Sequence, residues 1–174
     1  MLRYVRRLDD SVDLAFDRLR RHPRADWVAY VASEAADYSM AWHVISATIA
    51  VVDPSRRRHA VRMAATLGVE SLVVNGVIKR LVKRERPPLL EERAYLVRRP
   101  KTQSFPSGHA SSAAVATVLL TNAVPPLAPL WSALGATVAL SRIHNRMHHA
   151  SDVVAGAALG VAIAAAAKRI RPLP

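Results

Sequence analysis

The chain has 174 residues, no cysteine, and a formal net charge of +12 from 25 Lys and Arg against 13 Asp and Glu. The length suits one domain, and the lack of cysteine excludes disulfide frameworks, thiolate metal sites and cysteine nucleophiles. The charge implies an anionic partner, but an aromatic content of 5% is too low for base-stacking platforms, so we expect no nucleic acid.

Basic residues gather in short segments, and long apolar runs separate these segments. The basic segments are residues 1–24, 53–62, 79–101, 142–146 and 168–171. Whole stretches without charge are typical of helices that span a bilayer, whereas a soluble basic protein more often carries its charge on one face of amphipathic helices.

The first predicted element is an amphipathic helix over residues 2–21, within an interfacial segment 1–24. Its apolar face carries Leu2, Val5, Leu8, Val12, Phe16 and Leu19. We expect this helix to lie on a membrane surface, although packing on a soluble core would require the same pattern. It lacks the apolar core of a signal peptide, so nothing predicts cleavage or secretion.

Five apolar stretches follow and are expected to span the membrane. They cover residues 36–52 (with an extension back through 25–35), 60–82, 110–124, 127–140 and 153–167. Several are shorter than the roughly 20 residues that a span needs, so the flanking polar motifs have to continue the helices. The sequence therefore predicts a single all-α domain, an integral-membrane helical bundle of about five spans plus the N-terminal surface helix.

Alternation of the spans brings the segments richest in reactive side chains to the same membrane face. These segments are residues 79–87, 106–109 and 141–152. In the first, Lys79 and Arg86 are nearly two helical turns apart, and Pro87 ends the helix, so both cations are candidates for binding phosphate oxygens. The alternative is a basic interfacial collar, to which Arg80, Lys83 and Arg84 are assigned.

The second segment predicts the start of a helix. Ser107 has the features of an N-cap, Gly108 permits a tight turn, and the free N–H groups of the first helical turn form an anion site. His109 lies in that turn, where it is a candidate proton donor to a bound oxyanion. The alternative is an ordinary helix start with an incidental histidine.

In the third segment, His144, His148 and Asp152 recur every fourth residue, so on a helix they share one face. This spacing resembles a metal site. It also allows Asp152 to hydrogen-bond one ring nitrogen of His148 and make the other more nucleophilic. Arg142 adds a further phosphate-binding group. Because several cations surround a single carboxylate, we expect no metal and no cofactor, and the cluster suits phosphoryl transfer instead.

Together the motifs K-x6-RP, PSGH and SR-x5-H-x3-D resemble the signature of the type 2 phosphatidic acid phosphatase superfamily. The resemblance covers residues 79–152 and implies metal-independent phosphoester hydrolysis through a phosphohistidine. It implies that His148 is the nucleophile, that Asp152 orients it and that His109 protonates the leaving oxygen. It further implies that the phosphate is held by Lys79, Arg86, Ser107, the Gly108 N–H and Arg142.

Many membrane members of that superfamily have six spans, whereas here an amphipathic helix takes the place of the first. A site at the membrane interface implies an amphiphilic, phosphorylated lipid as substrate. The Ala- and Arg-rich composition resembles that of actinobacterial proteins, so the most specific expectation is decaprenylphosphoryl-5-phosphoribose. Alternatives are undecaprenyl diphosphate, phosphatidate and phosphatidylglycerol phosphate. An alternative of another class is a non-enzymatic basic membrane protein that binds anionic lipid.

The distribution of Lys and Arg predicts which side of the cell (inner) membrane carries the site. Outside the proposed phosphate ligands, the face of the site has Arg80, Lys83, Arg84, Arg93, Arg98, Arg99 and Lys101. With five spans, the N-terminal helix adds Arg3, Arg6, Arg7, Arg18, Arg20, Arg21 and Arg24. The opposite face has mainly Arg56, Arg57, Arg58, Lys168, Arg169 and Arg171. The positive-inside rule then predicts a multi-pass protein with a cytoplasmic active site.

Overall fold

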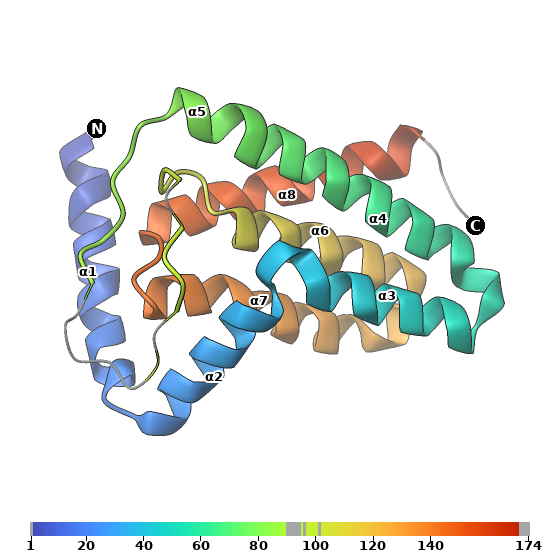
Figure 1. The fold of residues 1–174 in the computed structure, drawn as a ribbon, viewed down its shortest axis with the longest axis horizontal. Helices are drawn as coiled ribbons and strands as arrows, with labels where there is room; N and C mark the ends of the chain where they lie inside the picture. The colour runs from blue at the N-terminus through green and yellow to red at the C-terminus, as the bar shows by residue number, and fades with distance from the viewer. Residues whose placement is uncertain (1, 90–94, 96, 101, 171–174) are drawn as a thin grey trace.

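The computed structural model describes residues 2–89, 95, 97–100 and 102–170, and within them every regular element is a helix (Figure 1). The elements are α1 (Leu2–Arg20), α2 (Pro23–Ala35), η1 (Asp37–Ser39), α3 (Met40–Val52), η2 (Pro54–Arg56), α4 (Arg57–Ser71), the π-helix η3 (Leu72–Ile78), α5 (Lys79–Leu81), α6 (Gly108–Ala123), η4 (Pro125–Leu127), α7 (Ala128–His144) and α8 (Ala150–Ile170). The predicted all-α class is confirmed.

Helices α3, α4, α6, α7 and α8 form an elongated bundle, and α1 crosses one end of it (Figure 1). Helix α6 lies at the centre and packs against α4, α7 and α8. Two glycines of α8 allow the closest of these approaches. A Cβ atom at Gly156 would collide with the carbonyl of Ser107, and one at Gly160 with the carbonyl of Ser111. Small residues therefore bring α8 against the backbone of α6, as in helix packing within lipid.

Apolar side chains fill the centre of the bundle and also cover much of its outside. Trp42, Met63, Leu120 and Trp131 are buried in one core cluster. Many large apolar side chains remain exposed on the outer helices, among them Val44, Val61, Val69, Leu72, Val77, Leu130, Leu134, Val154 and Val161. Exposed apolar surface of this extent is typical of helices that face lipid. Two helical segments, Pro54–Leu81 and Ala150–Ile170, are long and apolar enough to cross a membrane.

The first predicted span is not one continuous helix. Helix α2 ends at Ala35, and Tyr38 and Ser39 have positive φ angles of 53° and 59° before α3 begins at Met40. The extension of the span back through residues 25–35 is therefore wrong, because left-handed residues interrupt the helical hydrogen bonds. Helices α6 and α7 lie where spans three and four were predicted, with 16 and 17 residues. The count of about five spans stays a prediction.

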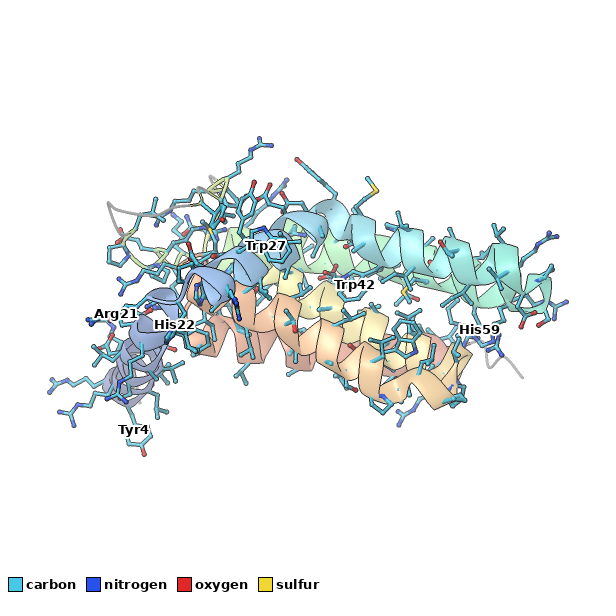
Figure 2. All side chains as sticks on the ribbon, turned by 90° about the horizontal axis from the view of Figure 1, so that it is seen from below. Tyr4, Arg21, His22, Trp27, Trp42 and His59 are labelled. Atoms are coloured by element: carbon cyan, nitrogen blue, oxygen red, sulfur yellow. The ribbon has the colours of Figure 1, made fainter. Side chains whose placement is uncertain are left out.

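Helix α1 packs on the protein through part of the face predicted to be apolar. Val12 and Phe16 contact a second core cluster of Ala110, Ile143 and Val153. Leu8 and Leu19 are about half exposed, and Tyr4 points away from the bundle (Figure 2). Contact of α1 with a membrane surface stays a prediction, but the helix is also attached to the end of the bundle.

Candidate functional site

A cavity of about 740 Å³ is lined by most of the predicted site residues. Six of the eight predicted residues line it: Lys79, Arg86, Gly108, His109, Arg142 and His148. Ser107 and Asp152 are completely buried and lie outside the lining. The three motifs therefore meet at one place, as the alternation of helices predicts.

His148 lies in a turn between two helices and not on a continuous helix. Helix α7 ends at His144, Arg146 has a positive φ of 52°, and α8 begins at Ala150. The prediction that His144, His148 and Asp152 share one helical face is therefore wrong. The His144 Nε2 atom lies 3.1 Å from Asp26 Oδ1 of α2, so His144 has a separate partner.

The hydrogen bonds of His148 define its tautomer. Its Nδ1 atom lies 2.6 Å from the backbone carbonyl oxygen of Ser104. Because a carbonyl only accepts, Nδ1 carries the proton and Nε2 carries the lone pair. Burial lowers the pKa of His148 to about 3, and the cations Arg86, Arg142 and Lys79 act in the same direction while Asp152 opposes them. The ring is therefore a neutral imidazole at pH 7.

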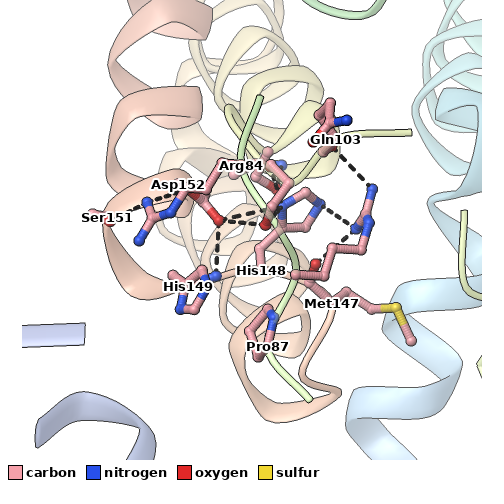
Figure 3. Close-up of polar contacts among 12 residues, drawn as sticks. Arg84, Pro87, Gln103, Met147, His148, His149, Ser151 and Asp152 are labelled. Carbon is pink, nitrogen blue, oxygen red and sulfur yellow. Dashed lines mark hydrogen bonds and ion pairs between the residues drawn. The ribbon is translucent and has the colours of Figure 1, made fainter. Parts of the chain in front are cut away.

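Asp152 acts on His148 less directly than the motif implies. Its Oδ2 atom lies 3.9 Å from His148 Nδ1, too far for a hydrogen bond. The Ser104 hydroxyl donates to Asp152 Oδ2 at 2.6 Å and lies 3.5 Å from His148 Nδ1, so Ser104 bridges the pair. Asp152 also accepts from the His149 N–H at 2.9 Å and from Arg84 Nη1 at 2.5 Å (Figure 3).

Ser104 and Arg84 were not predicted as site residues. Ser104 follows a polar loop without periodicity, so no spacing in the sequence marks it. Arg84 was assigned to the basic collar, yet it contacts Asp152, and its side chain is 25% exposed. A direct ion pair with a completely buried carboxylate makes Arg84 part of the site.

Arg86 is held beside the lone pair of His148 by backbone carbonyl groups. Its guanidinium donates to the carbonyl of Met147 at 2.7 Å and to that of Thr102 at 3.1 Å, and Nη1 lies 3.3 Å from His148 Nε2. The helix that carries Lys79 ends at Leu81, so Arg86 follows on an extended segment and not on the second helical turn predicted for it. Burial lowers the pKa of Arg86 to about 10, which leaves the guanidinium charged at neutral pH.

Lys79 and Arg142 are further cations in the lining of the cavity, which also includes Arg98 and Arg99. Lys79 and Arg142 are buried, with 8% and 1% of their surface exposed. A guanidinium nitrogen of Arg142 donates to the hydroxyl of Ser33 in α2. Buried cations are costly unless an anion accompanies them, so their convergence on one cavity favours an anionic ligand.

The second motif starts α6 as predicted. Ser107 is the N-cap, and its hydroxyl accepts from the Ala110 N–H at 3.4 Å. Gly108 lines the cavity, and a Cβ atom there would lie 3.0 Å from the side-chain oxygen of Asn75. His109 Nε2 lies 2.9 Å from Asp37 Oδ1 in η1. Sequence reasoning did not identify Asp37, because the positive φ angles of Tyr38 and Ser39 beside it, which are typical of strained functional sites, appear only in the structure.

Comparison with known sequences identifies the family. The sequence model of the PAP2 superfamily matches residues 59–173. The chain belongs to the PAP2 superfamily. This confirms the resemblance inferred from the three motifs, and the matched range contains all eight predicted site residues.

Individual PAP2 relatives are similar over most of their length. Decaprenylphosphoryl-5-phosphoribose phosphatase of Mycobacterium tuberculosis (strain ATCC 25618 / H37Rv) is 36% identical over 136 residues, which cover 76% of this chain and 73% of that protein. The protein of the same name from Mycolicibacterium smegmatis is 38% identical over 126 residues, or 71% and 67% of the two chains.

A solved PAP2 structure has the same fold. The transmembrane PAP2 type phosphatidylglycerolphosphate phosphatase from Bacillus subtilis superposes with a TM-score of 0.72 at 23% identity, over 98% of this chain and 90% of that chain. In the described part of this chain, the two long apolar helical segments are consistent with a transmembrane fold of this kind.

Proposed function

We propose that this PAP2 chain removes the phosphomonoester from decaprenylphosphoryl-5-phosphoribose or a closely similar polyprenyl-linked sugar phosphate. Superfamily membership and relatives named as phosphatases make it a phosphoric monoester hydrolase. The observation that carries the mechanism is the neutral, buried His148, whose Nε2 lone pair lies at a cavity with Lys79, Arg86 and Arg142 in its lining. A neutral imidazole is the nucleophilic form, and the cations suit a phosphate.

In the proposed reaction, His148 Nε2 attacks phosphorus while the bond from phosphorus to the sugar oxygen breaks. His109, whose Nε2 atom lies 2.9 Å from Asp37 Oδ1, gives a proton to that oxygen. Water then attacks the phosphohistidine after losing a proton to His109, which releases inorganic phosphate and restores both histidines. No metal takes part in these steps.

The surrounding groups stabilise charge during this transfer. Lys79, Arg86 and Arg142, with the N–H at Gly108, hold the phosphate oxygens as negative charge spreads over them. The imidazole becomes cationic as Nε2 bonds to phosphorus. The Ser104 carbonyl that accepts from Nδ1, and the Asp152 carboxylate beyond it, then stabilise the positive charge. The buried Ser107 hydroxyl contributes as the N-cap that fixes the Gly108 amide.

Two observations favour a sugar-phosphate lipid over the other predicted substrates. The first is the name shared by the relatives at 36–38% identity. The second is the cavity, which is larger than a phosphate ion and continues along α4 and η3 past Glu70, Ser71 and Asn75. These polar side chains suit the hydroxyl groups of a ribose between the phosphate and the lipid.

We further propose a multi-pass protein of the inner membrane with a cytoplasmic active site. Helix α1, which carries many of the arginines, crosses the end of the bundle where α5, the end of α7 and the start of α8 lie (Figure 1), and Lys79, Arg142 and His148 line the cavity from these parts of the chain. Arg56, Arg57 and Arg58 lie at the other end, in η2 and the start of α4. The excess of positive charge is therefore at the end with the site. The predicted contributions of Arg93, Lys101 and Arg171 fall outside the described residues.

The decisive test is a substrate panel with purified protein in detergent and EDTA. We expect phosphate release from the polyprenyl-linked phosphoribose to exceed release from undecaprenyl diphosphate, phosphatidate and phosphatidylglycerol phosphate.

His148→Ala should reduce release by about 10³-fold or more, whereas His149→Ala, one residue away, should not. Equal phosphate release by His148→Ala and wild type would exclude this mechanism, whereas no release by the wild type from any of these lipids would favour a basic lipid-binding protein. Transfer of phosphate to an acceptor alcohol instead of water would indicate phosphoryl exchange.

Sidedness is testable because the chain contains no cysteine. Lys83→Cys lies beyond the helix end at the site, and Ser55→Cys lies in η2 at the other end. An impermeant thiol reagent added to intact cells should label Ser55→Cys and leave Lys83→Cys unlabelled. The reverse pattern would place the active site on the outer face.

A further inference from the structure

Polar contacts behind Asp152 continue beyond the motifs into the N-terminal helix. Arg84 bridges two carboxylates: Nη1 contacts Asp152 Oδ1 at 2.5 Å, and Nη2 contacts Asp9 Oδ2 at 2.6 Å. Asp9 lies on α1, outside the range matched by the PAP2 superfamily, and only 4% of its surface is exposed. A buried carboxylate normally has a partner, and here the partner is Arg84, which also contacts Asp152.

Asp9 also holds the first turn of α8, which carries Asp152. The Ser151 N–H donates to Asp9 Oδ1 at 2.8 Å, and the Ser151 hydroxyl donates to Asp9 Oδ2 at 2.8 Å. The first N–H groups of a helix have no acceptor within the helix, and a carboxylate near them is also favoured by the helix dipole. Asp9 therefore caps α8 from another helix.

Arg84 closes the arrangement, because its Nη1 also donates to the Ser151 hydroxyl at 2.7 Å. Asp9, Arg84, Ser151 and Asp152 form a ring of hydrogen bonds and ion pairs on the side of Asp152 away from Ser104 (Figure 3 shows its Arg84, Ser151 and Asp152). An arginine side chain has several rotatable bonds, and carboxylates at two of its nitrogens restrict them.

We propose that Asp9 is a positioning residue for the phosphatase reaction, which holds Arg84 and the start of α8 so that Asp152 stays in place behind His148. This inference rests on the proposed function in that His148 is the nucleophile. It assigns a functional role to α1, in addition to any contact of that helix with the membrane.

The contacts of Asp9 explain why it affects the reaction. The ring of His148 becomes cationic when Nε2 bonds to phosphorus, and the Asp152 carboxylate behind it stabilises that charge. Without Asp9, Arg84 and the first turn of α8 lose a partner that holds them, so Asp152 is positioned less well and its stabilisation of the transition state weakens. The cations that hold the phosphate do not contact Asp9. The loss should therefore appear in kcat and not in KM.

The experiment compares Asp9→Asn with Asp10→Asn, using any phosphoester that the wild type hydrolyses. The two substitutions remove the same charge from adjacent positions of α1, but Asp10 is exposed. We expect Asp9→Asn to lower kcat about 10- to 100-fold, with KM changed less than threefold, because small misplacements of reacting groups have effects of this size. Asp10→Asn should stay within twofold of the wild type. A kcat of Asp9→Asn within twofold of the wild type would overturn the proposal.

A double-mutant cycle separates positioning from a merely structural role. If Asp9 acts through Asp152, the double variant Asp9→Asn with Asp152→Asn should be no slower than Asp152→Asn alone. Two losses that multiply would overturn the proposal. Should Asp9→Asn fail to fold, Arg84→Lys provides the same cycle, since lysine keeps the charge without bridging both carboxylates. Activity of His148→Ala tests the proposed function separately, whatever these ratios are.

Discussion

In residues 59–173, three short motifs supply the residues proposed to bind and transfer phosphate, whereas residues 2–58 supply partners for several of these groups. Asp9 contacts Arg84, the Ser33 hydroxyl accepts from Arg142, and Asp37 lies beside His109. The first region therefore carries the reactive side chains, and the second restricts their positions. The candidate site therefore extends beyond residues 59–173, the range that matches the PAP2 superfamily.

The largest expected difference is between the loss of kcat/KM on replacing Arg142 and the loss on replacing its partner Ser33. Arg142→Ala removes a cation from the phosphate cavity and should lower kcat/KM about 10²- to 10³-fold, because electrostatic stabilisation of the transition state is lost. Ser33→Ala removes only the hydroxyl that accepts from Arg142 and should lower kcat/KM about tenfold at most. Steady-state kinetics of both variants measure the difference. Equal losses of kcat/KM in the two variants would mean that Arg142 acts only when Ser33 holds it in place.

The parts of the site that were predictable share a physical basis. Helical periodicity and capping depend on residues close in sequence, so the N-cap of α6 at Ser107 and the places of α6 and α7 were predicted correctly. Convergence of the motifs followed from alternation of the helices. Each of these inferences uses only local pattern and chain direction.

The missed contacts join residues far apart in the sequence. Asp9 and Ser151 are 142 positions apart, and Ser33 and Arg142 are 109 positions apart. Polar pairs of this kind have no periodicity, and each partner by itself resembles an ordinary surface residue.

The error over residues 141–152 has another cause. A spacing of four residues indicates one face only if the helix continues, and here it stops after His144.

Arg20 tests the role of the N-terminal region in stability. Its side chain is 5% exposed, forms ion pairs with Asp13 and Asp17 at 2.6 Å, and donates to the carbonyls of Ile143 and His144 at the end of α7. Hydrogen bonds to a charged group each contribute about 1.5–3 kcal/mol, so Arg20→Gln should destabilise the protein by about 2 kcal/mol. Thermal unfolding in detergent measures the effect.

The control is Arg18→Gln, which removes the same charge from an exposed position of α1. Its melting temperature should remain within about a degree of the wild type, since isolated surface charges contribute little. If both variants melt like the wild type, α1 does not stabilise the bundle, and the partner role of this region is restricted to Asp9, Ser33 and Asp37.

The last prediction concerns pH and arises in the motif region. Burial lowers the pKa of His148 to about 3 in the folded protein, against about 6.5 for an unperturbed histidine. Between these values the unfolded chain binds the extra proton, so stability rises with pH. The contribution of the neutral buried ring is complete above pH 6.5 and is lost as the pH falls toward 3, by at most about 1.4 kcal/mol per pH unit.

Melting temperatures between pH 5 and 8 should therefore fall on acidification more steeply for the wild type than for His148→Gln. Parallel curves would show that acid sensitivity lies elsewhere, and the ion pairs of the N-terminal region would then be its source.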